Sequence, residues 1–363
     1  MSIFNLTNKE KTVFFSIVKY PELNDIELSE KTGIKRSTVT AIKNRLKAEK
    51  FYNTFVIPNL PALGVKVLSI LYGKFNPKYP RQERQKAGTF ESKLSHPELV
   101  FLQTSDSESF GIYMSTDLTE IRKAQDYFIL DYEAHDFYDL VKRVFYPIEL
   151  CDIYSFFNFS STVARLFSMK DDKPDIKPIW KGHSPINLTN TEKKIFHSIV
   201  KYPEANNIEI SKKTGKTRST VSKIRKRLLD EGLIRIVNMP TLDKLGCELM
   251  VSYHSAFNPK FPKKDRTDGT ELMAKIVTPI LHINGDIESS GLVAFKNYTE
   301  YTELSNKVLS FYKEKNYIQE SPFFLFFPFQ QLKWTKLDFA SLTEKLLFGE
   351  KKTEKAIKAK AAD

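Results

Sequence analysis

The chain has 363 residues, a length that predicts about two to four domains at roughly 100–150 residues each. Hydrophobic residues make up 41% of the sequence and charged residues 28%, which is typical of a folded, soluble protein and excludes a disordered chain. Lysine and arginine outnumber aspartate and glutamate by 56 to 44, so the formal net charge is +12. This surplus favours anionic partners such as nucleic acid or an acidic membrane surface.

The sequence contains two cysteines, Cys151 and Cys247, which lie far apart. They lack the paired spacing of a zinc site or a disulfide framework, so we interpret them as small buried side chains in a reducing compartment. The N-terminus has no basic region followed by an apolar core, and no run reaches the ~18 apolar residues that a membrane span needs. We therefore expect a cytoplasmic protein that does not enter a membrane.

One stretch of sequence occurs twice, as KTGIKRSTV at residues 31–39 and as KTGKTRSTV at residues 213–221. When residue n is aligned with residue n+182 from Leu6 to Lys47, 27 of 42 positions are identical. The match continues more sparsely, with Phe-Asn-Pro-Lys at residues 75–78 and again at 257–260. A period of ~180 residues predicts two tandem copies of a two-part protein rather than a solenoid of short repeats.

Each copy begins with three helical patterns. In the first copy, Thr7 and Glu10 form a capping-box signature before the first helix, which ends at Pro21. A short second helix is predicted at residues 26–32, and Gly33 supplies the left-handed position that follows it. The third helix, predicted at residues 36–50, is basic and amphipathic. This layout is typical of a helix-turn-helix, whose last helix can lie in a DNA groove.

Extended segments follow at residues 51–57 and 233–239, where each would form a wing or a connecting strand. After them, the pattern of the first copy predicts strands at residues 66–75, 99–104, 110–115 and 141–159. It predicts helices at residues 84–95 and 118–132. The second copy has the same order, with strands predicted at residues 248–257, 280–283, 292–295 and 323–337 and helices predicted at residues 269–277 and 298–315. This βαββαβ order indicates a ferredoxin-like sandwich, so the predicted fold class is α+β, with two copies of a winged helix-turn-helix followed by such a sandwich.

The predicted domains follow from this order. They are a winged helix-turn-helix (1–58), a ferredoxin-like domain (59–168), a charged, proline-bearing linker (169–185), a second winged helix-turn-helix (186–240), a second ferredoxin-like domain (241–348) and a basic tail (349–363). The tail is interpreted as a solvated, frayed helix or as an arm that contacts phosphate.

The third helix of each copy presents an apolar stripe on one face and polar or basic side chains on the other. The stripe consists of Val39, Ile42 and Leu46, and of Val221, Ile224 and Leu228. On the opposite face, the candidates for reading base edges are Ser37, Thr40, Ala41, Asn44, Ser219, Ser222, Lys223 and Lys226. The candidates for phosphate contact are Arg36, Thr38, Lys43, Arg45, Lys47, Lys50, Arg218, Thr220, Arg225 and Arg227.

For a single helix of this kind, a solvent-exposed face with no binding role would be as good an interpretation as DNA binding. Two copies of the same pattern favour binding of double-stranded DNA. The two faces differ, because Ala41 and Asn44 correspond to Lys223 and Lys226, so the copies are expected to read different half-sites.

The aromatic run at residues 323–329 has no alternation of apolar and polar residues. We interpret it as a strand buried on both faces, which would belong either to an ordinary core or to a sheet-to-sheet interface. In the second case the two ferredoxin-like domains would pair within one chain as a pseudo-dimer and match a roughly palindromic site.

Together, the helix-turn-helix, the strand after it, the Leu-Gly pair and the βαββαβ domain resemble the leucine-responsive regulatory protein (Lrp/AsnC) family of bacterial and archaeal regulators. The resemblance covers both halves and implies a DNA reader joined to a domain that pairs sheet to sheet and sometimes binds amino acids. It also leaves room for a homodimer and a small-molecule effector. The family's Gly-Asp-like hairpin turn is similar to Gly285-Asp286, whereas the first copy has Ser105-Asp106.

The sequence shows no catalytic constellation. Its six histidines are scattered, and Walker, dinucleotide-binding and nucleophile-elbow motifs do not occur. We therefore expect no enzyme activity, no cofactor and no metal site. The favoured function is a sequence-specific transcription regulator, and the alternative is an accessory or architectural factor that binds DNA with little sequence preference.

Overall fold

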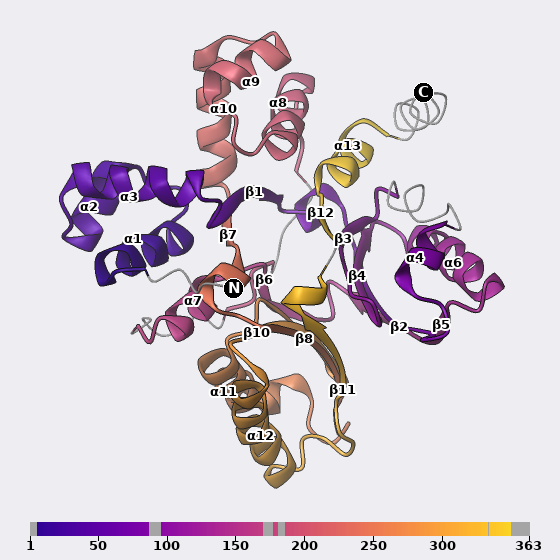
Figure 1. Cartoon of the computed structure of the whole chain (residues 1–363). Helices are drawn as coiled ribbons and strands as arrows, with labels where there is room; N and C mark the ends of the chain where they lie inside the picture. The colour runs from indigo at the N-terminus through magenta and orange to yellow at the C-terminus, as the bar shows by residue number, and fades with distance from the viewer. Residues whose placement is uncertain (1–5, 87–95, 170–176, 181–185, 333, 350–363) are drawn as a thin grey trace. The chain divides into compact units, whose positions relative to one another are not determined.

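The computed structural model describes residues 6–86, 96–169, 177–180, 186–332 and 334–349 (Figure 1). The chain forms two compact units, and each is assembled from three separate segments. Unit 1 contains Met1–Phe55, Cys151–Ile179 and Ile236–Phe329, and unit 2 contains Val56–Leu150, Trp180–Arg235 and Gln330–Asp363. Each unit therefore combines segments from both halves of the chain. Most of the predicted linker and nearly all of the predicted tail lie outside the described residues.

Each unit has one three-helix module of the predicted kind. Unit 1 contains α1 (Asn8–Lys19), α2 (Asp25–Thr32) and α3 (Arg36–Ala48), and unit 2 contains α8 (Asn190–Lys201), α9 (Asn207–Thr214) and α10 (Arg218–Asp230). The capping box of Thr7 and Glu10 is present, and Thr189 and Glu192 repeat it in α8. Gly33 and Gly215 both adopt a φ of 67°, which confirms the predicted left-handed turn before each third helix.

The extended segment after each module is a single strand, and the two strands pair with each other. They are β1 (Tyr52–Pro58) and β7 (Ile234–Pro240), which form a two-stranded sheet. Within unit 1, the Thr54 hydroxyl donates to Asn238 Oδ1 at 2.8 Å, and Asn238 Nδ2 donates to the Ile17 carbonyl at 3.0 Å. Within unit 2, the Asn59 amide donates to the Leu233 carbonyl at 2.8 Å. The predicted segment is thus a connecting strand.

The sheet of unit 2 has the order β12-β3-β4-β2-β5, and every neighbouring pair is antiparallel. Its strands are β2 (Val67–Phe75), β3 (Leu99–Thr104), β4 (Glu108–Ser115), β5 (Tyr138–Pro147) and β12 (Trp334–Leu337), joined by the helices α4 (Arg81–Lys86) and α6 (Leu118–Ala134). The helix predicted at 84–95 is described only to Lys86. Four strands from one half form the ferredoxin-like order, and β12 adds a fifth strand from the other half.

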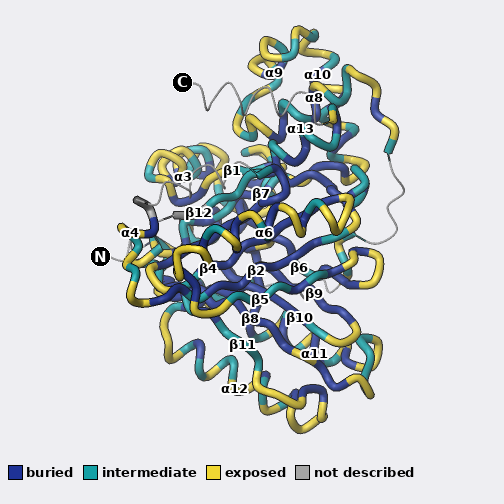
Figure 2. The backbone as a smooth tube through the Cα atoms, turned by 90° about the vertical axis from the view of Figure 1, so that its right-hand side faces the viewer, coloured by how far each residue is buried: buried dark blue, intermediate teal, exposed yellow. Residues whose placement is uncertain are grey.

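The sheet of unit 1 has the order β11-β8-β10-β9-β6, again antiparallel. Its strands are β6 (Asp152–Phe156), β8 (Leu249–Ala256), β9 (Leu281–Asn284), β10 (Glu288–Phe295) and β11 (Phe323–Pro328), with the helices α11 (Thr267–Leu272) and α12 (Tyr298–Glu314). A π-helical turn, Met273–Val277, continues α11. The α+β fold class, with two helix-turn-helix modules and two ferredoxin-like sheets, is confirmed. In Figure 2 the sheet strands are mainly buried, and exposed residues concentrate on helices and loops.

The last strand predicted in each half is interrupted, and its second part joins the other sheet. The strand predicted at 141–159 is divided into β5 in unit 2 and β6 in unit 1, because a turn intervenes. The strand predicted at 323–337 is likewise divided into β11 and β12 by the short helix Phe329–Gln331. The predictions of single continuous strands were wrong. Hydrophobic patterning detects an extended segment, but not the sheet that it joins.

We call β6 and β12 the exchanged strands, because each joins the sheet of the other half. A helix, called the exchanged helix, follows each of them and packs on the helix-turn-helix module of the same unit. These helices are α7 (Ser160–Leu166), which packs on α1 in unit 1, and α13 (Ala340–Phe348), which packs on α8 in unit 2. The rings of Phe14 and Phe167 lie 6.0 Å apart, and those of His197 and Phe348 also lie 6.0 Å apart. Each exchanged strand and helix therefore link a helix-turn-helix module to a sheet within one unit.

The aromatic run is an edge strand with two different faces. Leu325 and Phe327 are fully buried, whereas Phe324 and Phe326 are half-buried and pack against the core beneath α12. The prediction of a strand buried on both faces holds for one face only, because at the edge of the sheet the side chains of the other face stay partly exposed. Both cysteines are buried, and burial raises the pKa of each thiol to about 12, as expected for inert packing residues.

Arg165 holds α7 in unit 1. Its guanidinium is 2.5 Å from Glu300 Oε1 and 3.0 Å from the Thr278 hydroxyl, and it also donates to the Ala294 carbonyl. In unit 2, Lys345 of α13 is 3.3 Å from Glu120 Oε2 and 2.7 Å from Glu98 Oε1. The two exchanged helices thus carry a cation that pairs with a glutamate at the start of the long helix in their unit.

We predict that Arg165→Ala lowers the free energy of unfolding by about 2–4 kcal/mol, because it leaves a mostly buried carboxylate and a carbonyl without their donor. Urea unfolding followed by circular dichroism measures the change. Lys123→Ala is the control, since the Lys123 side chain is 71% exposed beside Glu120 and its loss should cost less than about 1 kcal/mol. Equal losses in the two variants would show that Arg165 does not anchor the segment.

Candidate nucleic-acid interface

The helices α3 and α10, called the reading helices below, have the same length and the same buried stripe. Each has 13 residues. The stripe residues Val39, Leu46, Val221 and Leu228 are fully buried, and Ile42 and Ile224 are at least nine-tenths buried. The stripe packs on the other two helices of each module, so the opposite face of each reading helix is directed away from them.

The residues predicted to read bases lie mostly on this outer face. Ser37, Ala41 and Asn44 of α3 and Ser219, Ser222, Lys223 and Lys226 of α10 are exposed. Thr40 differs, because it is half-buried and its hydroxyl donates to Asp25 Oδ2 at 2.7 Å. Its hydroxyl is therefore already engaged within the module.

The residues predicted to contact phosphate fall into two groups. Arg36, Lys47, Lys50 and Arg218 are exposed, and Thr38 and Thr220 are half-exposed. Four others bond to their own module: Lys43 to Asp25 at 2.9 Å, Arg45 to Glu10 at 2.7 Å, Arg225 to the Ala205 carbonyl at 2.8 Å and Arg227 to Glu192 at 2.5 Å. In these contacts the cations hold the reading helix against the first and second helices.

The pair formed by Arg227 and Glu192 combines two structural tasks. Glu192 accepts the Thr189 amide in the capping box of α8 at 2.8 Å and also pairs with Arg227 of α10. The Thr189 amide, together with the Thr189 hydroxyl and Arg227, holds the pKa of the Glu192 carboxyl below its usual value. Arg45 and Glu10 form the same connection between α3 and α1. Sequence reasoning missed these acidic partners, although the alignment of residue n with residue n+182 places Glu10 and Arg45 opposite Glu192 and Arg227.

The two reading helices begin differently. Lys35, the first flanking residue of α3, makes no side-chain hydrogen bond to the helix. The Thr217 hydroxyl at the start of α10 accepts the Thr220 amide at 3.2 Å. A helix N-terminus attracts anions through its amides and its dipole, so α3 presents the less capped of the two ends to a phosphate.

A further pair of cations lies on α2 and α9 and was not predicted. Lys31 Nζ lies 4.0 Å from the ring centre of Tyr20, and Lys213 Nζ lies 3.9 Å from that of Tyr202. Both lysines are exposed, and these contacts place a positive charge next to the helix-turn-helix turn. The repeated Lys-Tyr-Pro and Lys-Thr-Gly sequences were the available signal.

Among the described residues, no helix is both long and apolar enough to cross a membrane. Within the same residues, no three His, Cys, Asp or Glu side chains gather as ligands for a metal ion.

Comparison with sequence families supports a regulator-type module in the second half. Residues 184–251 match the family described as sugar-specific transcriptional regulator TrmB. This range contains α8, α9, α10 and β7, including one reading helix. No curated protein matches the chain.

Comparison with solved structures identifies a fold shared over the whole length. The siroheme decarboxylase NirDL matches 97% of this chain and 100% of its own, with 14% identity and a TM-score of 0.54. NirDL in co-complex with an iron-uroporphyrin III analogue matches 96% and 100%, with 14% identity and a TM-score of 0.53. LrpC from B. subtilis matches 39% of this chain and 95% of its own, with 14% identity and a TM-score of 0.30.

The prediction that the chain is not an enzyme was wrong, because an enzyme has the same fold. NirDL is a decarboxylase, and it shares the fold over 97% of this chain. The absence of known sequence motifs was therefore insufficient evidence, because one fold can carry different chemistry at different sites. The element order implied by the resemblance to the Lrp/AsnC family is present in the structure.

We predict that Glu192→Gln lowers the free energy of unfolding by ~1 kcal/mol at pH 7.5, because it weakens a helix cap and an ion pair. The folded-state pKa of Glu192 is depressed, so this contribution is present above its unfolded pKa and is lost as the pH falls through the folded pKa. Urea unfolding at pH 7.5 and pH 3 should show the deficit shrinking in acid.

The control for this change is Asp230→Asn, at an exposed position of α10. It should alter the free energy of unfolding by less than about 0.5 kcal/mol. A Glu192→Gln deficit of the same size at both pH values would contradict the assigned role of the ionised carboxylate.

Proposed function

We propose that the protein is a DNA-binding transcription regulator, built from two tandem copies, that presents α3 and α10 to double-stranded DNA. One observation carries the proposal: both units contain a 13-residue helix with the same buried stripe and an exposed polar and basic face. The family match that includes α10 supports it. A cytoplasmic location, where the chain would meet DNA, is part of the proposal.

In this proposal the exposed outer face of each reading helix reads base edges. The assigned residues are Ser37, Ala41, Asn44, Ser219, Ser222, Lys223 and Lys226, together with Thr40, whose hydroxyl would have to leave Asp25 to reach a base. Asn44 can bond adenine through its amide, and Lys223 and Lys226 can donate to guanine. Because the two faces differ in charge, we expect a binding site with two unlike half-sites. The two copies within one chain would then bind DNA together, as the two subunits of a dimer do.

The phosphate contacts are assigned first to the exposed residues Arg36, Lys47, Lys50 and Arg218. Thr38 and Thr220 would add hydroxyl contacts. Lys43, Arg45, Arg225 and Arg227 can reach phosphate only while they also serve their own modules. A homodimer and a small-molecule effector remain compatible with this proposal.

The alternative is an accessory or architectural factor with little sequence preference. Selection of bound sequences from a random DNA library distinguishes the two functions. A regulator should enrich a motif and bind it at least ~10³-fold more tightly than random DNA at physiological salt. Strong, steeply salt-dependent binding without an enriched motif would favour the alternative and end the regulator proposal.

We predict that Arg36→Ala and Arg218→Ala each weaken binding on all DNA sequences and reduce the slope of log affinity against log salt by about 1. Fluorescence anisotropy over a salt series measures both quantities. Lys307→Ala is the matched control, because it removes one exposed charge from α12. If both arginine variants keep the wild-type slope, the DNA surface must lie elsewhere on the chain.

A second candidate function is catalysis on a tetrapyrrole, favoured by the likeness to NirDL over 97% of the chain. The cavity between the sheet and helices of unit 1 does not fit such a substrate. This cavity has a volume of about 60 Å³ and no charged side chain in its lining. Drug-sized ligands occupy roughly 300–1,000 Å³. A carboxylated macrocycle would need a wider and more basic site than this cavity.

The second candidate is tested with an iron porphyrin that carries carboxylate groups. If it is correct, titration should shift the Soret absorption band in a saturable way, and incubation should release carbon dioxide. A linear, unsaturable titration without carbon dioxide release would reject this candidate while leaving the DNA-binding proposal untouched.

A further inference from the structure

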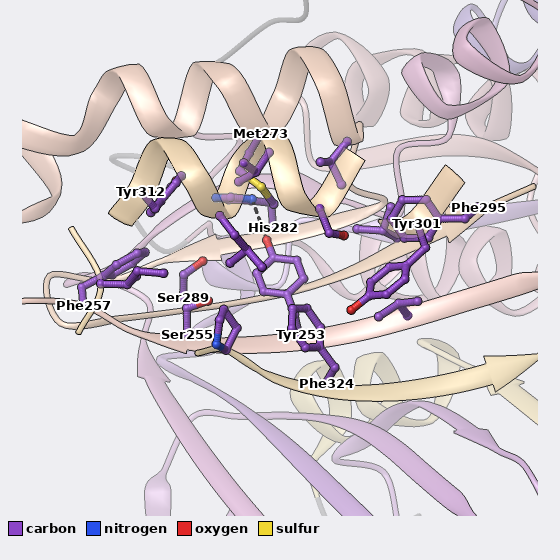
Figure 3. Close-up of a pocket in the computed structure, with 18 residues that line it drawn as sticks. Tyr253, Ser255, Phe257, Met273, His282, Ser289, Phe295, Tyr301, Tyr312 and Phe324 are labelled. Atoms are coloured by element: carbon purple, nitrogen blue, oxygen red, sulfur yellow. Dashed lines mark hydrogen bonds between the residues drawn. The ribbon is translucent and has the colours of Figure 1, made fainter. Parts of the chain in front are cut away.

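Unit 1 contains a cavity between its sheet and the helices that cover it. Strands β8, β9 and β10 form its floor, and α12 and the π-helical turn Met273–Val277 cover it (Figure 3). Its volume is about 60 Å³. The lining is mainly apolar, with a few polar residues, and contains no charged side chain.

A polar pair crosses the floor of this cavity. Gly291 of β10 is paired with Tyr253 on one side and with His282 on the other, so the three residues form one row across the sheet. Gly291 has no side chain, and a Cβ at this position would lie 2.5 Å from the Tyr253 ring. The ring therefore extends over Gly291, and its hydroxyl lies 2.9 Å from His282 Nδ1 (Figure 3).

His282 retains one unused polar atom. Burial lowers the pKa of its imidazole to about 4, so the ring is neutral near pH 7. Nδ1 is engaged by Tyr253, whereas the buried Nε2 has no hydrogen-bond partner among the described residues. A buried polar atom without a partner costs about 1–3 kcal/mol, so a ligand that bonds it recovers this cost.

The corresponding row in unit 2 is apolar. There Gly111 of β4 is paired with Leu71 and Leu102, which occupy the places of Tyr253 and His282. The hydrogen-bonding pair is therefore specific to unit 1 and is not needed to form this type of sheet.

The space above the row also differs between the units. The sheet registers and the equal lengths of α6 and α12 align Val293, Val308 and Ile318 of unit 1 with Tyr113, Phe128 and Tyr138 of unit 2. The three larger side chains belong to the buried core of unit 2. Tyr138 even occupies the space above Gly73, where a Cβ would lie 2.6 Å from its ring. Smaller side chains leave the corresponding space of unit 1 open.

One wall of the cavity has an irregular backbone. Met273 and Val277 line it from the π-helical turn, and Thr278 follows in a left-handed conformation with a φ of 54°. π-Helical turns occur frequently at functional sites, and a methionine side chain adapts to irregular shapes. Thr278 is held by Thr162 and Arg165 of the exchanged segment. Met273 and the turn are the parts that can yield to an entering molecule.

We propose that this cavity is a binding site for a small neutral molecule with an apolar body and a single hydroxyl or carbonyl group. The apolar lining takes the body, and the polar group bonds His282 Nε2. Amino acids and other charged molecules are disfavoured, because the lining offers no opposite charge. An apolar cavity of about 150 Å³ is known to hold benzene, so a phenol-sized ligand must displace Met273 or the turn.

The test uses phenol, toluene and benzoate with the full-length protein. We expect phenol and toluene to bind saturably at millimolar concentration in ligand-observed NMR, and benzoate not to bind. His282→Leu introduces the residue that unit 2 has at this place. It should reduce the preference for phenol over toluene about tenfold, the equivalent of one hydrogen bond of ~1.4 kcal/mol.

A second variant tests the location. Val308→Phe introduces the residue that unit 2 carries at this position and should abolish binding of both molecules while near-UV circular dichroism stays unchanged. If this variant fails to fold, Ile318→Tyr replaces it for the same reason. The proposal is overturned if wild type binds neither molecule, if benzoate competes with phenol, if the filled variant binds as wild type does, or if His282→Leu leaves the preference unchanged.

Discussion

The structure depends on a reciprocal pairing of charges at the two exchanged helices. Arg165 of α7 pairs with Glu300, and Lys345 of α13 pairs with Glu120, so both ion pairs join a helix from one half to a long helix from the other. The strands β6 and β12 precede these helices and complete the two five-stranded sheets. Each helix-turn-helix module is consequently attached, through a strand and a helix of its own half, to a sheet that comes mainly from the other half.

Much of the fold could be predicted from local sequence. Capping boxes, Gly33 and Gly215 defined the first three helices of each half, and β3 has the predicted bounds of Leu99–Thr104. The predictions failed where one apolar pattern continued from a strand of one sheet into a strand of the other sheet, as from β5 to β6 and from β11 to β12. Periodicity reports which side chains are buried, and an exchanged strand has the same pattern as a strand that stays with its own sheet.

The buried and exposed faces of the two reading helices were predicted from the helical period, whereas their contact with DNA stays a prediction. The buried stripes of α3 and α10 and the exposed side chains opposite them agree with helical geometry. Counting positive residues could not reveal that Arg45 and Arg227 serve their own modules, because the acidic partners lie about 35 residues earlier in the chain. The cavity of unit 1 was also hidden, since it depends on side-chain volumes on separate elements.

The exchange of the terminal strand and helix has a consequence for synthesis of the protein on the ribosome. Unit 1 needs residues up to Phe329, and unit 2 needs β12 and α13, so neither can finish folding when only the first half has emerged. Until β12 and α13 emerge, β3 presents an unpaired edge, and α8, once synthesised, has no covering helix. Nascent chains therefore wait with an open sheet edge, which favours pairing between neighbouring polypeptides on one messenger RNA.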